Sequence, residues 1–533
     1  MKTFTALDWQ KSNRKATMSK YDPILPLTHT DAYKLGHIHM YPEGTTRVLS
    51  NFTDRGSRIE GVTHTVHFGL QAFLKDWLGS WDSFFQADED LVAGLYEEFV
   101  TSILGPNNIG SDHIRALHRL GYLPLRFRSL PEGALVPLRV PKVTVENTHP
   151  DFFWLTNYIE TALSTYLWQP ATSATIALRM RNLLDEWAVK TTGSTAGVEF
   201  ANHDFSFRGM PGIWSAASSG AGHLLVFNGS DSLGSTPWID TFYPGDNGFI
   251  QGSVPATEHS VATAYGPEDE LGYFSRLLDA NPTGFLSMVS DSYDLWGVLT
   301  NVLPALKDKI MARDGRLVIR PDSGDPVDII AGSFKLSDRR MANPENNQTQ
   351  YEYAVKMHGE RSPEEKGVFE LLWDTFGGTV NEQGYKVLDP HVGVIYGDSI
   401  TYDRAKLILE RLEAKGFAFS NLVFGTGSYT YQYQTRDTFM SAMKATWVEV
   451  NGEGRDIYKD PITDSGTKKS ARGRIAVMQT SDGEYKLIDS TSEEDVSEYE
   501  ESEYDHLTVV WEDGKLLKEY SFAEVRANLG YIV

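Results

Sequence analysis

The chain has 533 residues, too many for one ordinary hydrophobic core, so we expect two domains or one large barrel with an appendage. Its 49 basic and 72 acidic residues give a formal net charge of −23, which excludes bulk electrostatic attraction to nucleic acid or to an anionic membrane. The absence of cysteine excludes disulfides, thiolate metal sites and a cysteine nucleophile.

Residues 1–24 are expected to form an N-terminal extension. They lack the continuous apolar core of a signal peptide, and no run of about 18 apolar residues follows anywhere in the chain. We therefore expect an intracellular, cytoplasmic protein with no membrane partner.

Both ends of the chain predict a mostly antiparallel α+β domain made of residues 25–193 and 436–533. The tail carries two hairpin signals, "IAVMQTSDGEYKLID" and "LTVVWEDGKLLKEY", each with an Asp-Gly turn between apolar runs. Residues 491–505, "TSEEDVSEYEESEYD", are acidic and predict a solvated loop.

Residues 194–435 repeat one pattern, in which a short apolar run ends in polar residues and a helical pattern follows. The runs are "GVEFANHDFSFRG" (197–209), "HLLVFNGSDS" (223–232), "GFLSMVSDSYD" (284–294), "RLVIRPDSGDP" (316–326), "VGVIYGDS" (392–399) and "LVFGTGS" (422–428). This alternation predicts parallel strands with right-handed crossovers. We expect an irregular (β/α) barrel, with a doubly wound sheet as the open alternative.

Two helices and one excursion accompany these strands. The clearest helical pattern is at 402–416, ending at Gly416, and a second lies at 174–190. Residues 334–366 are polar and read as an excursion between two strands, mobile at its tip.

Charged residues gather where the predicted strands end, at one rim if the barrel forms. They are Arg208, Asp231, Asp291, Asp294, Arg320, Asp322 and Asp398, together with the loop 425–427. Arginine suits phosphate oxygens, and carboxylates accept from sugar hydroxyls, so the combination predicts a site for a phosphorylated sugar. Each aspartate alone is more often a turn or helix cap.

Two further residues fit such a site. His259 follows the segment "QGSVP" near a predicted helix start, where it could act as a nucleophile or an acid/base, although a lone histidine is more often structural. Phe205 stands beside Arg208 at a strand end, where an aromatic ring can hold a planar heterocycle or simply belong to the core.

The motifs together resemble the nicotinamide phosphoribosyltransferases, a family with the type II phosphoribosyltransferase fold. They are "TDAYKLGHIHMYPEGTTRV", "HDFSFRG", "GSDS", "SVPATEHS", "VSDSYD", "IRPDSGDP", "YGDS", "FGTGS" and "TRD", in this order over roughly residues 25–533. The resemblance implies a homodimer that transfers ribose 5-phosphate from phosphoribosyl pyrophosphate to nicotinamide, giving nicotinamide mononucleotide and pyrophosphate in NAD salvage.

The resemblance also assigns the base-binding residues. Phe205 and, from the other subunit, Tyr33 would sandwich nicotinamide. Asp231 would accept a hydrogen bond from the carboxamide, and its charge would repel nicotinic acid. Arg208 would contact the base and the ribosyl phosphate. Asp31, Ser253 and Val254 would also line the site.

The same resemblance assigns the sugar and phosphate contacts. Arg320 would hold a phosphate or pyrophosphate group, and Asp322, Gly397 and Asp398 would hold the ribose hydroxyls. The remaining residues implied at phosphate groups are Gly427, Ser428, Arg436, Lys444, Lys459, Lys468 and Arg55. The family pattern would carry more glycines than "GTGSY", so Ser428 and Tyr429 are expected to narrow the approach to the phosphate.

A coupling reaction with ATP is implied as well. His259 matches a histidine that the family phosphorylates with ATP, and Asp294 would orient its imidazole. Mg²⁺ would be held mainly by pyrophosphate and water, so no firm protein ligand for the metal is predicted.

Three alternatives stay open on the sequence alone. A nicotinate phosphoribosyltransferase would share the fold and most of the site, and Asp231 argues against it. A (β/α) barrel lyase or isomerase acting on a sugar phosphate would leave Phe205 and His259 without a role. A non-catalytic protein with a degenerate site is disfavoured because the rim residues are intact.

Overall fold

The computed structural model describes residues 19–334, 347–459, 463, 470–501 and 503–531. The chain folds into two compact units. Unit 1 contains residues 1–175, 237–248 and 434–533, and unit 2 contains 176–236 and 249–433. Helix α7 (Glu160–Thr192) runs from the first unit into the second, and the domain boundary expected at residue 193 falls just after its end.

Unit 1 is built on a seven-stranded sheet in which every neighbouring pair is antiparallel. The strand order is β14 (Glu453–Asp456), β13 (Ser441–Val450), β1 (Thr45–Asp54), β5 (Pro141–Asn147), β3 (Leu125–Ser129), β17 (Thr508–Glu512) and β18 (Lys515–Leu516). Two smaller pairs are β2 (His64–Val66) with β4 (Leu135–Pro137), and β15 (Arg474–Gln479) with β16 (Tyr485–Thr491). Strands from both ends of the chain share the large sheet, which confirms the expected antiparallel α+β architecture.

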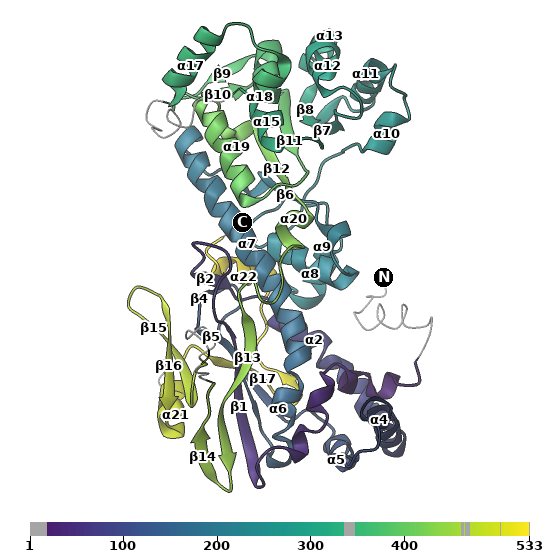
Figure 1. The fold of residues 1–533 in the computed structure, drawn as a ribbon, viewed down its shortest axis with the longest axis vertical. Helices are drawn as coiled ribbons and strands as arrows, with labels where there is room; N and C mark the ends of the chain where they lie inside the picture. Colours follow the sequence, from purple (N-terminus) through teal and green to yellow (C-terminus); the bar gives the residue numbers. More distant parts are fainter. Residues whose placement is uncertain (1–18, 335–346, 460–462, 464–469, 502, 532–533) are drawn as a thin grey trace. The chain divides into compact units, whose positions relative to one another are not determined.

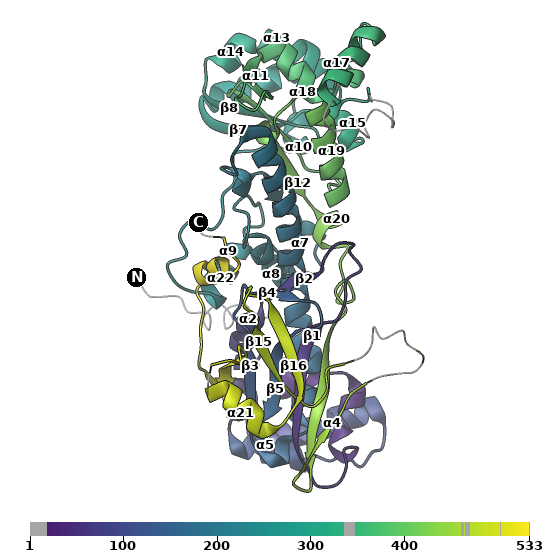
Figure 2. The same cartoon turned by 90° about the vertical axis from the view of Figure 1, so that its left-hand side faces the viewer.

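Both predicted hairpins are confirmed. β15 pairs with β16 and β17 with β18, each across an Asp-Gly turn. At the second turn Asp513 and Gly514 have φ of 47° and 83°, the left-handed backbone that a two-residue hairpin loop requires. Figures 1 and 2 show β15, β16 and α21 (Glu493–Glu501) lying over one face of the large sheet.

The solvated loop expected at 491–505 is wrong, because residues 493–501 form α21. Ser492 Oγ accepts from Asp495 N at 2.9 Å, and Asp495 Oδ2 accepts from Ser492 N at 3.2 Å, a reciprocal cap at the start of the helix. Val496 is 4% exposed, so the acidic helix also buries an apolar side chain. Local capping and one buried residue thus outweigh the acidic composition.

The helices of unit 1 pack mainly on the opposite face of the sheet. They are η2 (Asp22–Thr28), η3 (Ala32–Lys34), η4 (His37–His39), α2 (Leu70–Asp76), η5 (Gly79–Trp81), α3 (Asp82–Gln86), α4 (Glu89–Leu104), α5 (Asp112–Leu120), η6 (Pro150–Phe152), α6 (Leu155–Tyr158), the start of α7, and α22 (Phe522–Asn528). One continuous core joins most of them, though not α22, to the sheet, and in it Phe73 stacks on Trp77 and meets Phe127 of β3. Each such buried aromatic contributes about 2–3 kcal/mol of hydrophobic stabilisation, which keeps this sheet a firm base.

Unit 2 contains a parallel sheet in the order β6 (Asn202–Asp204), β12 (Leu422–Thr426), β11 (Val392–Tyr396), β8 (Asp314–Arg320) and β7 (Thr283–Val289). Single parallel bridges complete the ring from β6 back to β7: Asp204 with Ser230, Gly229 with Gly252, and Ala256 with Ser287. Five of the six expected strands are confirmed, and the sixth segment, 223–232, contributes only bridges. The result is the expected irregular barrel.

Helices cover the outside of this barrel, with α15, α18 and α19 along β8 and β11 (Figure 1). The helices of unit 2 are the end of α7, η7 (Val198–Phe200), η8 (Phe207–Gly209), α8 (Ile213–His223), α10 (His259–Thr263), α11 (Glu270–Ala280), α12 (Leu295–Gly297), η9 (Val298–Val302), α13 (Leu303–Ala305), α14 (Lys307–Met311), α15 (Pro326–Ala331), α17 (Asn347–His358), α18 (Pro363–Phe376), α19 (Tyr402–Ala414), η11 (Phe419–Asn421) and α20 (Ser428–Tyr431). The strands β9 (Gly378–Val380) and β10 (Lys386–Leu388) form a separate pair, and α9 (Ser235–Phe242) starts in unit 2 and ends in unit 1.

The predicted helices lie where expected, with one extension. α19 ends before Gly416, whose φ of 78° suits glycine after a helix. α7 begins fourteen residues before the expected 174 and continues through Pro170. A proline inside a helix normally ends or kinks it, so the surrounding packing must stabilise the helix at this point. The excursion 334–366 contains α17, which packs on α19 through Tyr351 and Ala414, while its expected mobile tip, 335–346, lies outside the described residues.

Candidate active site

Phe205 follows the end of β6 and lies against two glycines from neighbouring strands. A Cβ added at Gly425 would come within 2.9 Å of the Phe205 ring, and one at Gly397 within 3.8 Å, so glycine at 425 leaves the ring its place. The Arg320 guanidinium lies 5.5 Å from the ring centroid and the His203 ring lies 4.7 Å away. Phe205 therefore presents an aromatic face flanked by a cation, which suits a planar heterocycle.

Asp231 lies beside this ring as a held carboxylate. Its Oδ1 accepts from His203 Nε2 at 2.9 Å and from Ser253 Oγ at 2.5 Å. Burial alone would raise the pKa of Asp231, but these two hydrogen bonds, helped by the charge of Arg320, outweigh it and hold the pKa below its usual value. Asp231 is thus an ionised acceptor at neutral pH.

Arg320 ends β8 and is fixed by the adjoining segments. Its Nη1 donates to Thr257 O at 3.1 Å, and its Nη2 lies 3.5 Å from Asp322 Oδ2. Within the described residues its buried Nε has no hydrogen-bond partner. A buried N–H donor without a partner costs free energy unless a ligand accepts from it, so the Nε–H of this guanidinium suits an anionic group.

Asp322 and Asp291 form a carboxylate pair at the ends of β8 and β7. Asp291 Oδ2 accepts from Asp322 N at 2.8 Å and from Ser323 Oγ at 2.5 Å, which ties the two strand ends together. Burial raises the pKa of Asp322, and Asp291 and Asp398 add to this rise against the opposing charge of Arg320. Asp322 therefore belongs to a crowded group of acids suited to accept from hydroxyls.

His259 opens α10 and faces this pair. Its Nδ1 lies 3.0 Å from Ser292 Oγ, and its Nε2 lies 3.9 Å from both Asp291 Oδ1 and Asp322 Oδ2. The imidazole is 47% exposed, whereas the Asp291 side chain is 4% exposed. His259 is thus accessible to solvent, with its Nδ1 bonded to a hydroxyl and its Nε2 facing two carboxylates.

Asp294, expected to orient His259, occupies a different position. Its Oδ1 accepts from Gly297 N at 3.0 Å and caps the first turn of α12. Within the same segment, the groups that face the imidazole are Ser292 and Asp291, two and three residues before Asp294. The segment "VSDSYD" thus reaches His259 through its first aspartate and its second serine, and the spacing within it did not reveal which aspartate caps the helix.

Gly397 and Asp398 follow β11 at the same rim. A Cβ at Gly397 would come within 3.4 Å of Asp322 Oδ1, so these two predicted ribose-binding positions are neighbours. Asp398 is exposed, and its charge contributes to the raised pKa of Asp322.

Gly427 and Ser428 stand at the end of β12, where α20 begins. A Cβ at Gly209 would lie 2.0 Å from Ser428 Oγ, so the hydroxyl fills the space that this glycine leaves. Arg208, next to Gly209, is exposed. Tyr429 is exposed and stacks on Tyr433 at 4.7 Å.

A cavity of about 820 Å³ occupies the barrel interior. At the carboxyl ends of the strands its wall includes Phe205, Asp231, Ser253, Val254 and Arg320. The wall then follows the strands to their amino ends, where it includes Arg316, Asn381, Phe419 and Asn421. The barrel centre is therefore open rather than filled by side chains. Four of the predicted base-binding residues, Phe205, Asp231, Ser253 and Val254, line it, whereas Arg208 is not among the lining residues and Tyr33 and Asp31 belong to unit 1.

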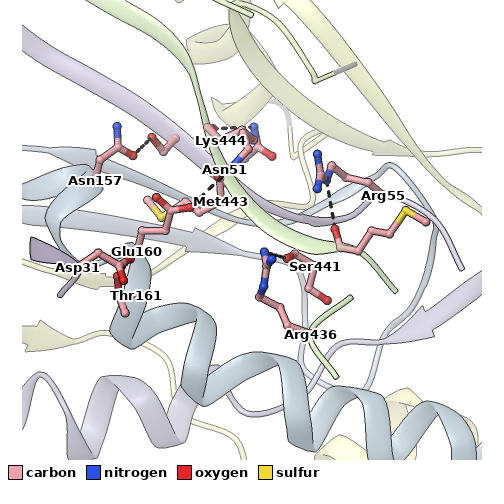
Figure 3. A network of polar contacts seen from close by, with 12 residues as sticks. Asp31, Asn51, Arg55, Asn157, Glu160, Thr161, Arg436, Ser441, Met443 and Lys444 are labelled. Carbon is pink, nitrogen blue, oxygen red and sulfur yellow. Dashed lines mark hydrogen bonds and ion pairs between the residues drawn. The ribbon is translucent and has the colours of Figure 1, made fainter. Parts of the chain in front are cut away.

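Several other predicted residues belong to unit 1. Asp31, Arg55, Arg436 and Lys444 lie in the network shown in Figure 3, and Tyr33 is bonded to Asp31. Tyr33 is 64% exposed, and its hydroxyl donates to Asp31 Oδ2 at 3.2 Å. Thr161 Oγ1 donates to the same oxygen at 2.7 Å. This arrangement offers an exposed aromatic ring beside a fixed carboxylate.

Four cations lie close to these residues and form what we call the cationic cluster: Lys34, Arg55, Arg436 and Lys444. Glu160 joins two of them, with Lys34 Nζ at 2.6 Å and Lys444 Nζ at 3.7 Å. Burial lowers the pKa of Lys444; Glu160 opposes this and the other three cations of the cluster reinforce it. The mutual repulsion suits a site that binds phosphate.

Backbone contacts fix the two arginines of the cluster. Arg55 Nε donates to Met440 O at 3.1 Å, and Arg436 Nη1 donates to Ser441 O at 2.9 Å (Figure 3). Ser441 begins β13, which pairs with β1 and places Lys444 opposite Asn51. Arg55 and Lys444 therefore stand near the ends of two paired strands and Arg436 is bonded to the first residue of β13, while Lys34 comes from η3.

A buried ion pair lies next to Arg55, at the end of β1. Lys142 Nζ meets Asp54 Oδ2 at 2.6 Å, and Asp54 also accepts from Thr65 Oγ1 at 2.7 Å and Ser441 Oγ at 2.5 Å. Burial would raise the pKa of Asp54, but Lys142 and the two hydroxyls hold it below its usual value. Because Asp54 directly precedes Arg55, this pair anchors the cluster.

One further predicted residue, Lys459, is not brought to these groups. Lys459 is exposed beyond β14, with its backbone nitrogen bonded to Ser470 Oγ at 3.0 Å. Lys468 lies outside the described residues. Within the described chain, no set of three or more His, Asp or Glu side chains is arranged to hold a metal ion. Nor do the described helices include one long and apolar enough to cross a bilayer.

Comparisons with known proteins agree with this arrangement. The sequence model of the nicotinate phosphoribosyltransferase (NAPRTase) family matches residues 200–505, and that of the nicotinamide phosphoribosyltransferase N-terminal domain matches residues 26–93. Nicotinamide phosphoribosyltransferase of Acinetobacter baylyi is 46% identical over 520 residues, covering 95% of this chain and 97% of that protein. Its counterpart in Mycoplasma pneumoniae is 37% identical over 459 residues, covering 84% and 94%.

A solved structure supports the fold. Nicotinate-nucleotide pyrophosphorylase from Pyrococcus furiosus superposes with a TM-score of 0.52 over 97% of both chains at 16% identity. The sequence matches span nearly the whole chain and include both units. The chain therefore belongs to the nicotinate phosphoribosyltransferase (NAPRTase) family and, within it, to the nicotinamide phosphoribosyltransferases.

Proposed function

We propose that this protein transfers the 5-phosphoribosyl group of phosphoribosyl pyrophosphate to nicotinamide, giving nicotinamide mononucleotide and pyrophosphate in NAD salvage. The observation that carries the choice of base is the ionised Asp231 beside the Phe205 ring. A carboxylate accepts from the NH₂ of a carboxamide and repels the carboxylate of nicotinic acid. Membership of a phosphoribosyltransferase family leaves no support for a barrel lyase, an isomerase or a degenerate site.

The reaction is a displacement at the anomeric carbon with an oxocarbenium-like transition state. Phe205 orients the pyridine ring, so that its nitrogen approaches the sugar from a fixed direction. Asp322 and Asp398 accept from the ribose hydroxyls, and their charge stabilises the cationic sugar. Arg320 neutralises the departing pyrophosphate, which its unused Nε–H donor supports.

The cationic cluster binds the 5-phosphate. Glu160 pairs with Lys34 and Lys444, and Asp437 pairs with Arg436 at 3.0 Å. Besides burial, the other three cations still lower the pKa of Lys444, so a dianionic phosphate would relieve their repulsion. We propose that the cluster and Tyr33 act on the active site of a second copy, in a homodimer whose sites are shared across the interface. The exposure of Tyr33 supports this, because its ring meets His37 at 5.7 Å within its own chain and is still 64% exposed, which leaves a face open to stack on a ligand.

ATP is the proposed coupling substrate. When Nδ1–H of His259 donates to Ser292 Oγ, the Nε2 lone pair is available to attack the γ-phosphorus; the phosphoryl group moves to Nε2 and ADP leaves. Hydrolysis of the phosphohistidine later restores the imidazole. The energy released favours an otherwise poorly favourable transfer.

Mg²⁺ is the implied metal, and the acids at the rim fit it. Asp291 Oδ1 is buried and, among the described residues, has no hydrogen-bond partner. Asp322 Oδ2 and Asp291 Oδ1 both lie 3.9 Å from His259 Nε2, so the two carboxylates face the same space. Oxygen donors suit this ion, which keeps most of its waters and would be held mainly by pyrophosphate. When bound, it would neutralise phosphate charge.

We also propose a cytoplasmic location, because charged phosphorylated substrates cannot cross the membrane and are retained there.

Product analysis tests the function. The purified protein is incubated with equal amounts of nicotinamide and nicotinic acid, phosphoribosyl pyrophosphate and Mg²⁺, with and without ATP, and the products are separated by mass. We expect nicotinamide mononucleotide and pyrophosphate, in greater yield with ATP. Faster formation of nicotinic acid mononucleotide would make the protein a nicotinate phosphoribosyltransferase.

A further inference from the structure

We propose that His203 is a positioning residue that holds Asp231 in the orientation needed to select nicotinamide over nicotinic acid. This inference rests on the proposed function. It concerns a side chain that sequence reasoning passed over, although His203 begins the motif "HDFSFRG".

The geometry singles out one oxygen of Asp231. His203 Nε2 and Ser253 Oγ both approach Oδ1, at 2.9 Å and 2.5 Å. Among the described residues, Oδ2 is therefore the oxygen left to accept from a ligand. The Asp231 side chain is 43% exposed, so burial alone would leave it free to rotate about its side-chain bonds. The two hydrogen bonds to Oδ1 hold the carboxylate in one rotamer and thereby fix the direction in which Oδ2 points.

The imidazole itself is held on several sides. His203 lies within β6, opposite Gly425 of β12, and its side chain is 11% exposed. A Cβ at Gly229 would come within 2.9 Å of His203 Nδ1, so this glycine makes room for the ring. The Phe205 ring covers it at 4.7 Å. A rigid donor thus fixes a partly exposed acceptor.

His203 also helps to keep the acceptor charged. A hydrogen bond donated to a carboxylate favours its ionised form over its neutral form. The ionised form of Asp231 accepts from an amide ligand and repels the carboxylate of an acid ligand. In either protonation state of the ring, Nε2–H can donate to Asp231, so the positioning does not depend on the charge of the histidine. Against the effect of burial, the positive charge of Arg320, at the end of β8, also lowers the pKa of Asp231.

The test is a double-mutant cycle with His203→Leu and Asp231→Asn, together with the rescue variant His203→Gln, which keeps an N–H donor. The kcat and KM of each variant are measured for nicotinamide, nicotinic acid and phosphoribosyl pyrophosphate. We expect His203→Leu to raise the KM for nicotinamide by about tenfold, the loss of one charged hydrogen bond, with kcat and the phosphoribosyl pyrophosphate KM changed less than about threefold.

The cycle separates positioning from a merely structural role. With Asp231→Asn already present, His203→Leu should add less than about twofold, because its effect acts through that carboxylate. His203→Gln should recover most of the nicotinamide KM. The control is His391→Leu, since His391 makes a similar pair with Asp389 at 2.7 Å at the amino end of β11 and should leave the nicotinamide KM unchanged.

The outcomes are distinct. Additive losses in the cycle, or a lower kcat with an unchanged nicotinamide KM, would overturn the role of His203 while the wild-type activity still stands. A wild-type protein that converts neither base would instead overturn the proposed function. If His203→Leu melts early, the His203→Gln variant carries the comparison, and a Gln variant as impaired as a folded Asp231→Asn variant would contradict the proposal.

Discussion

Charged side chains at the barrel rim of unit 2 lie at strand ends and on the loops that follow, where they hold one another, whereas Arg55 and Lys444 of the cationic cluster in unit 1 stand near the ends of two long paired strands. At the rim, Asp291 is tied by Asp322 N and Ser323 Oγ, and the barrel itself is completed by single bridges. In unit 1, nine residue pairs join β1 to β13, with Lys142 and Asp54 buried beneath.

The difference matches two tasks. A reacting sugar and base need charged groups held where charge develops, and the rim side chains fix one another in place through their mutual hydrogen bonds. A phosphate that does not react needs only to be held, and a firm sheet serves that end. The account therefore predicts that changes at the rim alter chemistry, while changes beneath the cluster alter stability and phosphate binding together.

The largest effect is expected at His259. His259→Ala removes the nitrogen that would accept a phosphoryl group, so ATP hydrolysis should vanish while some phosphoribosyl transfer remains. ADP release is measured alongside nucleotide formation. Ser292→Ala should retain ATP hydrolysis at a lower rate, since it only loosens the ring. An unchanged response to ATP in His259→Ala would remove this residue from the mechanism.

Next comes the buried pair of unit 1. Asp54→Asn leaves Lys142 charged and without its ion-pair partner, which should cost about 3–5 kcal/mol of the free energy of unfolding. Denaturant unfolding measures this loss, and the KM for phosphoribosyl pyrophosphate should rise with it. Replacing both residues, as Asp54→Leu with Lys142→Met, should recover stability but not phosphate binding if the pair serves to place Arg55.

The same pair gives a pH dependence. The folded pKa of Asp54 is held below 3.8, so its contribution to stability is complete well above that pH and is lost as the pH falls through the folded pKa. In the double replacement the acid limb of the stability curve should flatten. An identical acid limb in both proteins would show that Asp54 titrates without linkage to folding.

A smaller effect is expected at Arg320. Arg320→Ala should raise the KM for phosphoribosyl pyrophosphate by roughly tenfold or more, the loss of a charged hydrogen bond in a shielded site. Arg316→Ala, the matched change at the other end of β8, should change it less than about threefold. Equal effects of the two variants would place the phosphate contact elsewhere.

The smallest effect is expected at Ser428. The sequence suggests that its side chain narrows the approach to the phosphate, but the hydroxyl occupies the space left by Gly209. Ser428→Gly should therefore change the KM for phosphoribosyl pyrophosphate by less than about threefold. A fall of tenfold or more would mean that Ser428 does obstruct the site.

Regular features were the predictable ones. The apolar runs ending in polar residues located β7, β8, β11 and β12 because parallel strands in a barrel share one pattern, and the Asp-Gly turns located two hairpins. The rim residues Phe205, Asp231 and Arg320 come to one cavity because strand ends in a barrel meet.

What sequence could not supply depends on contacts between distant segments. Ring closure rests on single bridges without a strand's periodicity, and Pro170 lies inside a helix that tertiary packing sustains. Which of Asp291 and Asp294 faces His259 is decided by a helix cap, not by spacing. Residues 493–501 of the acidic segment form a helix that a reciprocal cap and one buried valine support.

One measurement bears most directly on the central claim that an ionised Asp231 selects the uncharged base. It is the ratio of kcat/KM for nicotinamide to kcat/KM for nicotinic acid, determined for the wild-type protein and for Asp231→Asn. The account predicts a ratio well above one that falls by roughly tenfold or more in the variant, as the repulsion of one carboxylate by another is removed. A ratio that stays the same in the two proteins would contradict it.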